Sequence, residues 1–95
     1  MAKEKVDEQG RIHIQQYFLE VSGLKGVKSI LFIEEEERKY RIIPKDNVPE
    51  GTKISLPPHS FDKKGRLIIP SYLRKLYLLS QVDVYVQDSK LYIEF

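Results

Sequence analysis

A five-residue pattern, Asp-x-x-Gly-Arg, occurs twice in this sequence, at residues 7–11 and again at residues 62–66. The offset of 55 residues aligns a wider stretch, because seven of 26 positions are identical between residues 6–31 and 61–86. Composition alone would give about one or two identities. The identical pairs are Asp7/Asp62, Gly10/Gly65, Arg11/Arg66, Ile14/Ile69, Tyr17/Tyr72, Leu24/Leu79 and Val27/Val82. The chain is therefore predicted to hold an internal duplication, which restricts the fold to two similar units.

Each copy of the pattern predicts the same order of elements. Asp bonds to nearby backbone amides and Gly adopts positive φ, so the pattern suits a tight turn between two strands. Pro70 lacks an N–H group, which ends the second short strand and suits a first helical turn. A hairpin then closes each unit. The predicted bounds are strands at Arg11–Ile14 and Arg66–Ile69, helices at Gln15–Val21 and Pro70–Tyr77, and hairpins that pair Val27–Ile33 with Tyr40–Ile43 and Val82–Gln87 with Leu91–Phe95.

A chain of 95 residues fits one compact domain. We divide it into a first repeat, residues 1–43, and a second repeat, residues 52–95, joined by the turn-rich residues 44–51. Thr52–Leu56 is expected to add a strand. Because each half is too small to bury both faces of its own strands, the two repeats are expected to share one core.

Positive charge is concentrated in the second repeat. Residues 62–75 contain five cations and one anion, and this local excess of 5 − 1 = +4 exceeds the net charge of +2 of the whole chain. The five cations are Lys63, Lys64, Arg66, Arg74 and Lys75. The first repeat keeps Arg11 but has Glu8, Gln9, Leu19 and Glu20 where the other cations would stand. A polyanion is therefore expected to meet the second repeat first.

A run of four glutamates, Glu34–Glu37, lies between the strands of the first predicted hairpin. Such a run is typical of a solvated loop that keeps a hairpin soluble. It is also compatible with repelling DNA or with binding a basic partner.

Several chemistries are not expected. The absence of cysteine excludes disulfides, thiolate catalysis and cysteine zinc sites. No histidine–carboxylate spacing suits a zinc helix, and neither a Gly-x-Ser-x-Gly turn nor a glycine-rich phosphate loop is present. We therefore expect no enzymatic activity, no metal and no cofactor. No apolar run approaches the roughly 18 residues that span a bilayer, and no secretory signal is visible. The expectation is a cytoplasmic protein without a membrane partner.

The second copy resembles the N-terminal signature of the AbrB/MraZ/SpoVT family. The matching residues are Asp62, Gly65, Arg66, Leu67, Ile69, Pro70, Leu73 and Arg74. The resemblance implies a mainly β fold with short helices, in which the hairpins of two units interleave as a swapped-hairpin barrel. One chain would supply both units here, as in the MraZ branch, so the barrel would be an intrachain pseudo-dimer.

The same resemblance implies a DNA-binding transcriptional regulator. In such regulators the arginine after the glycine and the basic pair of the helix contact DNA, and these roles fall on Arg66, Arg74 and Lys75, with Arg11 in the first repeat. Lys63 and Lys64 add cations for phosphate contacts. We expect the second repeat to bind duplex DNA while the first mainly completes the barrel. One such face is small, so a homo-oligomer is expected to repeat it.

Three alternatives stay open. The cations could be a solvated surface in which Arg66 only bonds Asp62. The chain could be a MazE-like antitoxin with a toxin partner, since those proteins use similar barrels. It could also be an interaction or scaffold barrel that does not bind nucleic acid. His13 alternates with Ile12 and Ile14, so it is expected to point outward beside Arg11, as a surface residue or as a phosphate or base contact.

Overall fold

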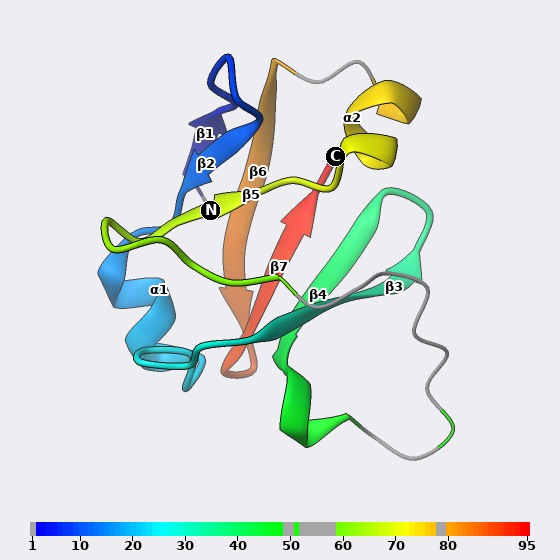
Figure 1. Ribbon diagram of the computed structural model, residues 1–95. Coiled ribbons are helices and arrows are strands. Elements are labelled where there is room, and N and C mark those ends of the chain that lie inside the picture. Colours follow the sequence, from blue (N-terminus) through cyan, green and yellow to red (C-terminus); the bar gives the residue numbers. More distant parts are fainter. Residues whose placement is uncertain (1, 49–50, 52–58, 78–79) are drawn as a thin grey trace.

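The computed structural model describes residues 2–48, 51, 59–77 and 80–95 and is mainly β with two short helices (Figure 1). This confirms the predicted fold class at that level. The elements are β1 (Ala2–Lys5), β2 (Arg11–His13), α1 (Gln16–Val21), β3 (Ile30–Glu36), β4 (Lys39–Pro44), a 3-10 turn (Lys45–Asn47), β5 (Arg66–Ile68), α2 (Ser71–Tyr77), β6 (Gln81–Gln87) and β7 (Lys90–Glu94). The strand expected at Thr52–Leu56 lies outside the described residues.

Five strands form one sheet in the order β1-β6-β7-β4-β3. All neighbours are antiparallel, and the strands of the two repeats alternate in an exchanged manner. β1 of the first repeat pairs with β6 of the second, while His59 of the second repeat forms a bridge with Ile30 of β3. Each hairpin is therefore bordered by the N-terminal arm of the other repeat. The described strands form two separate sheets that do not close into a barrel, so the expected barrel is not shown.

The second sheet is a two-stranded antiparallel ribbon of β2 and β5, and its pairing is symmetric between the repeats. Ile12 lies opposite Leu67, its equivalent at an offset of 55 residues. Two further hydrogen bonds continue the pattern: Ile14 N–H donates to the Gly65 carbonyl at 3.1 Å, and Ile69 N–H donates to the Gly10 carbonyl at 2.8 Å. These bonds are related by the same offset, so a local pseudo-twofold axis passes through the Ile12–Leu67 pair.

The large sheet has the same kind of symmetry, but with a different offset. In the β4–β7 pairing, Arg41 lies opposite Tyr92, which is 51 residues later. The pairs Tyr40–Ile93 and Ile42–Leu91 exchange under this offset. Four residues therefore separate the two offsets. One of them is the bulge between Glu34 and Glu36 in β3, which the second hairpin lacks. The other three lengthen the connection from α1 to β3.

The structure therefore changes one part of the expected repeat alignment. At the bridge to the neighbouring N-terminal arm, Ile30 pairs with His59 just as Val82 pairs with Glu4. Ile30 is thus the counterpart of Val82, whereas the uniform offset of 55 had assigned Val27 to that place. The expected pair Leu24/Leu79 cannot be compared because Leu79 lies outside the described residues.

The acidic tip of the first hairpin also differs from the expectation. Glu34–Glu36 belong to β3 rather than to a loop, and the turn is formed by Glu37 and Arg38. The strand continues because its partners supply bonds: the Tyr40 hydroxyl donates to the Glu34 carboxylate at 2.9 Å, and Glu36 pairs with Lys39. The four glutamates remain exposed.

One core lies between the ribbon and the large sheet. The ribbon buries every second side chain, because β2 and β5 each alternate buried and outward positions. Both repeats contribute, which agrees with the expected shared core. The fully buried side chains are Tyr40, Phe32, Ile12, Ile14, Leu24, Ile30, Leu31, Leu67, Ile69, Leu73, Leu91 and Ile93.

Two neighbouring residues of β5 test this burial pattern. Leu67 is fully buried beside Ile12, whereas Ile68 is 49% exposed. We expect Leu67→Ala to lower the free energy of unfolding by about 2–5 kcal/mol, because it leaves a cavity in the shared core. Ile68→Ala should change it by no more than about 0.5 kcal/mol. Urea unfolding followed by circular dichroism measures both; equal effects would contradict the assigned faces of the ribbon.

Candidate nucleic-acid interface

The second Asp-x-x-Gly-Arg turn is organised by one carboxylate. Asp62 Oδ1 accepts hydrogen bonds from the backbone N–H groups of Lys64 at 2.9 Å and Arg66 at 2.8 Å. Asp62 Oδ2 accepts from Arg66 Nε at 2.6 Å. Gly65 has φ of 75°, which closes the turn without strain. The aspartate thus fixes both the backbone of the turn and the direction of the arginine.

The first turn repeats this arrangement bond for bond. Asp7 accepts from the backbone N–H groups of Gln9 at 2.9 Å and Arg11 at 2.8 Å, and from Arg11 Nε at 2.8 Å. Gly10 has φ of 77°. Because the side chains at positions 8 and 9 make none of these bonds, Glu8 and Gln9 can replace the lysines without changing the turn.

The hydrogen bonds shift the ionisation of both aspartates. Backbone N–H donation from the arginine is the largest cause that lowers the pKa of Asp7 and of Asp62 below 3.8, and the guanidinium side chain adds to it. A lowered folded-state pKa stabilises the fold above the unfolded pKa, and the stabilisation is lost as the pH falls through the lower value. Both turns should therefore weaken below about pH 4.

The outward surface of the ribbon, here called the basic face, carries Arg11, His13, Arg66 and Ile68. The register places Arg11 opposite Ile68 and His13 opposite Arg66, so the two arginines lie diagonally across the two strands. His13 is exposed, as expected. Ile68 was not expected here, because the apolar run Leu67–Ile69 conceals the period-two alternation that turns Ile68 outward.

Each end of the basic face has a different source of charge. Lys63 and Lys64 are exposed in the second turn, at one end of the ribbon. At the other end the guanidinium of Arg74, from α2, lies directly against Gly10 of the first turn. Arg74 Nε is buried there and has no hydrogen-bond partner within the described residues. Lys75 is exposed on the same helix.

This placement differs from a surface confined to the second repeat. Arg74 belongs to the second repeat in sequence but lies against the turn of the first, and Arg11 shares the outer face with Arg66. α1 and α2 lie at opposite ends of the ribbon (Figure 1). The cations that cluster in the sequence are thus spread along both halves of one surface. The charge lost at Glu8 and Gln9 is replaced in space by Arg74.

Comparisons with known proteins identify no relatives: no family model, no curated protein and no solved structure matches this chain. Within the described residues, no helix is both long and apolar enough to cross a membrane. The same part of the chain contains no cluster of three or more His, Cys, Asp or Glu side chains suited to a metal ion.

The turn carboxylates predict how stability depends on acid. We expect the wild-type free energy of unfolding to fall between pH 5 and pH 3 as Asp7 and Asp62 are protonated. Asp7→Asn and Asp62→Asn should each be less stable at pH 6 and should each reduce that fall. The effects should add, because the turns are separate.

Urea unfolding at pH 6 and pH 3 measures these changes. Asp46→Asn is the matched control, since Asp46 is exposed and makes no hydrogen bond or ion pair with the described residues. An acid dependence that is identical in wild type and in the Asp7→Asn/Asp62→Asn double variant would contradict the role given to the turns.

Proposed function

We propose that this chain is a DNA-binding transcriptional regulator of the AbrB/MraZ type, which contacts duplex DNA through the basic face of the β2–β5 ribbon. The observation that carries the proposal is the pair of arginines on this face, each held in position by an aspartate of its own turn. A two-stranded ribbon has dimensions that the DNA major groove admits. Side chains on its outer face would then reach base edges and phosphates.

The manner in which the arginines are held supports this function. In both turns the aspartate bonds Nε, and no hydrogen bond to the described residues uses the terminal amino groups of Arg11 or Arg66. A guanidinium fixed through Nε keeps two donors in a defined plane, which suits a phosphate or the acceptor edge of guanine. The alternative of a merely solvated surface explains the Asp–Arg pairs but not their joint outward placement.

Lys63, Lys64, Arg74 and Lys75 would add phosphate contacts at the two ends of the ribbon. Phosphate contacts position a protein on DNA, and base contacts or DNA shape give sequence preference. The face is small, so we propose that a homo-oligomer presents it more than once. Such a regulator would act in the cytoplasm without a cofactor.

The exchanged strands support the proposed family architecture. Each N-terminal arm borders the hairpin of the other repeat, as expected when two swapped-hairpin units form an intrachain pseudo-dimer. Pseudo-twofold pairing at both Ile12–Leu67 and Arg41–Tyr92 agrees with this interpretation.

The proposal predicts a specific loss of DNA binding. The Arg66→Ala/Arg74→Ala double variant should bind random duplex DNA roughly a hundredfold more weakly, since each lost charged contact is worth roughly 1.5 kcal/mol. The slope of log K against log salt should fall by about two, one for each lost phosphate contact. Fluorescence anisotropy between low and physiological salt measures both quantities.

The matched control is Lys45→Ala/Lys90→Ala, which also removes two positive charges. Both lysines are exposed, lie off the ribbon and make no ion pair with the described residues. This variant should keep most of the affinity. Equal weakening by the two variants would mean that binding follows net charge alone. Absence of salt-dependent binding by the wild type would reject the DNA proposal in favour of a scaffold.

A further inference from the structure

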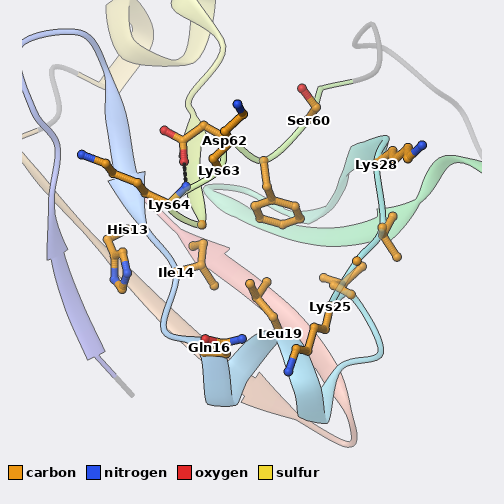
Figure 2. A pocket seen from close by; sticks show the side chains of 15 residues that line it. His13, Ile14, Gln16, Leu19, Lys25, Lys28, Ser60, Asp62, Lys63 and Lys64 are labelled. Atoms are coloured by element: carbon orange, nitrogen blue, oxygen red, sulfur yellow. Dashed lines mark hydrogen bonds between the residues drawn. The ribbon is translucent and has the colours of Figure 1, made fainter.

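An open groove of about 720 Å³ lies beside the second turn, between that turn, α1 and the connection that follows α1 (Figure 2). Its floor is apolar and consists of Ile14, Leu19, Leu24 and Phe61. This groove belongs to neither strand of the basic face, so the proposed function does not account for it.

Four lysines surround the apolar floor: Lys25, Lys28, Lys63 and Lys64 (Figure 2). Lys25 forms an ion pair with Glu20 at 3.1 Å. The other three have no ion pair with any described residue. The one carboxylate among the lining residues is Asp62, and its oxygens already accept bonds within the turn. The groove therefore has an excess of positive charge around an apolar surface.

The pseudo-symmetry shows why the groove is open on this side. Leu19 is the counterpart of Arg74, and Gly65 is the counterpart of Gly10. In the other half the guanidinium of Arg74 fills the space over Gly10. Here the shorter Leu19 leaves that space empty, and a Cβ built on Gly65 would meet nothing nearer than the Ile14 carbonyl at 3.7 Å.

The longer connection of the first repeat supplies the opposite wall. Eleven residues lead from Leu19 to Ile30, against eight from Arg74 to Val82. The extended connection carries Leu24, Lys25 and Lys28, which all line the groove. Its start is fixed, because the Leu24 and Lys25 N–H groups both donate to the Leu19 carbonyl, at 2.8 and 3.1 Å. Two departures from symmetry therefore build one cavity.

We propose that this groove is a binding site for a small organic anion with a flat apolar body, such as an aromatic carboxylate, sulfonate or phosphate. The ring would lie on Phe61 and Leu19, and the anionic group would meet the lysines. The volume lies in the range of small-molecule sites, which combine an apolar lining with a few polar groups. The proposal does not depend on DNA binding.

The test uses naphthalene-2-sulfonate as the probe and its uncharged sulfonamide as the matched control ligand. In a ¹H–¹⁵N NMR titration of the full chain, the sulfonate should shift the amide signals of Gly65 and Gly26. Gly10, the counterpart of Gly65 in the filled half, serves as an internal control and should not shift. The sulfonamide should bind at least about fivefold more weakly, because it lacks the charge. Equal shifts at Gly10 and Gly65 would overturn the site.

Leu19→Arg separates occupation of the groove from simple charge attraction. The substitution adds a positive charge but should fill the groove as Arg74 fills the other half, so the shifts at Gly65 and Gly26 should be lost. The other half accommodates an arginine at the equivalent position, and circular dichroism checks that the variant folds. Unchanged or tighter binding by Leu19→Arg would overturn the proposal.

Arg74→Leu is the reciprocal variant. It should open the filled half, so the sulfonate should then also shift Gly10, while binding at Gly65 persists. Dilution of the free wild type provides the last check and should leave Gly65 and Gly26 unchanged. Concentration-dependent shifts there would place the acidic hairpin of another copy in the groove and would overturn the small-anion assignment.

Discussion

The pairing of β2 with β5 is the interaction on which the rest of the structure depends. It joins the turn of one repeat to the turn of the other through backbone bonds between Ile14 and Gly65 and between Ile69 and Gly10. A short ribbon of two strands has little stability by itself. It is held because one of its faces, with Ile12 and Leu67 at the centre, closes the core over the five-stranded sheet. The outer face is thereby left free for polar side chains, and both arginines occupy it.

Symmetry constrains the backbone of this protein more than it constrains the side chains. The two turns use the same carboxylate bonds, whereas the residues around them have diverged in charge and size. Positions that make no bond of the turn, such as Glu8 and Lys63, were free to change. The result is a symmetric frame with one filled end and one open end. Lys63 and Lys64 border both the basic face and the groove, so the charge of one turn serves two surfaces.

The sequence predicts the local structure here better than the relation between distant parts. The turns, both helices within a residue or two, and the shared core follow from short-range signals such as Asp-x-x-Gly and apolar spacing. The alignment of the hairpins does not, because three added residues and a bulge change the offset without leaving a local signal. The position of Arg74 is equally hidden, since it results from packing α2 against the turn of the other repeat. Closure of the strands into a barrel was expected from resemblance alone, and the described strands do not show it.

The two turn glycines show how the same residue can be required for different reasons. Both have positive φ, so any side chain at either position would strain the backbone. At Gly65 that is the main constraint, because the space beyond it is open. At Gly10 a Cβ would also collide with the guanidinium of Arg74. Gly10 therefore lets a cation from α2 lie directly on the backbone of the first turn. The cations of the second repeat reach the first only because this turn has no side chain in the way.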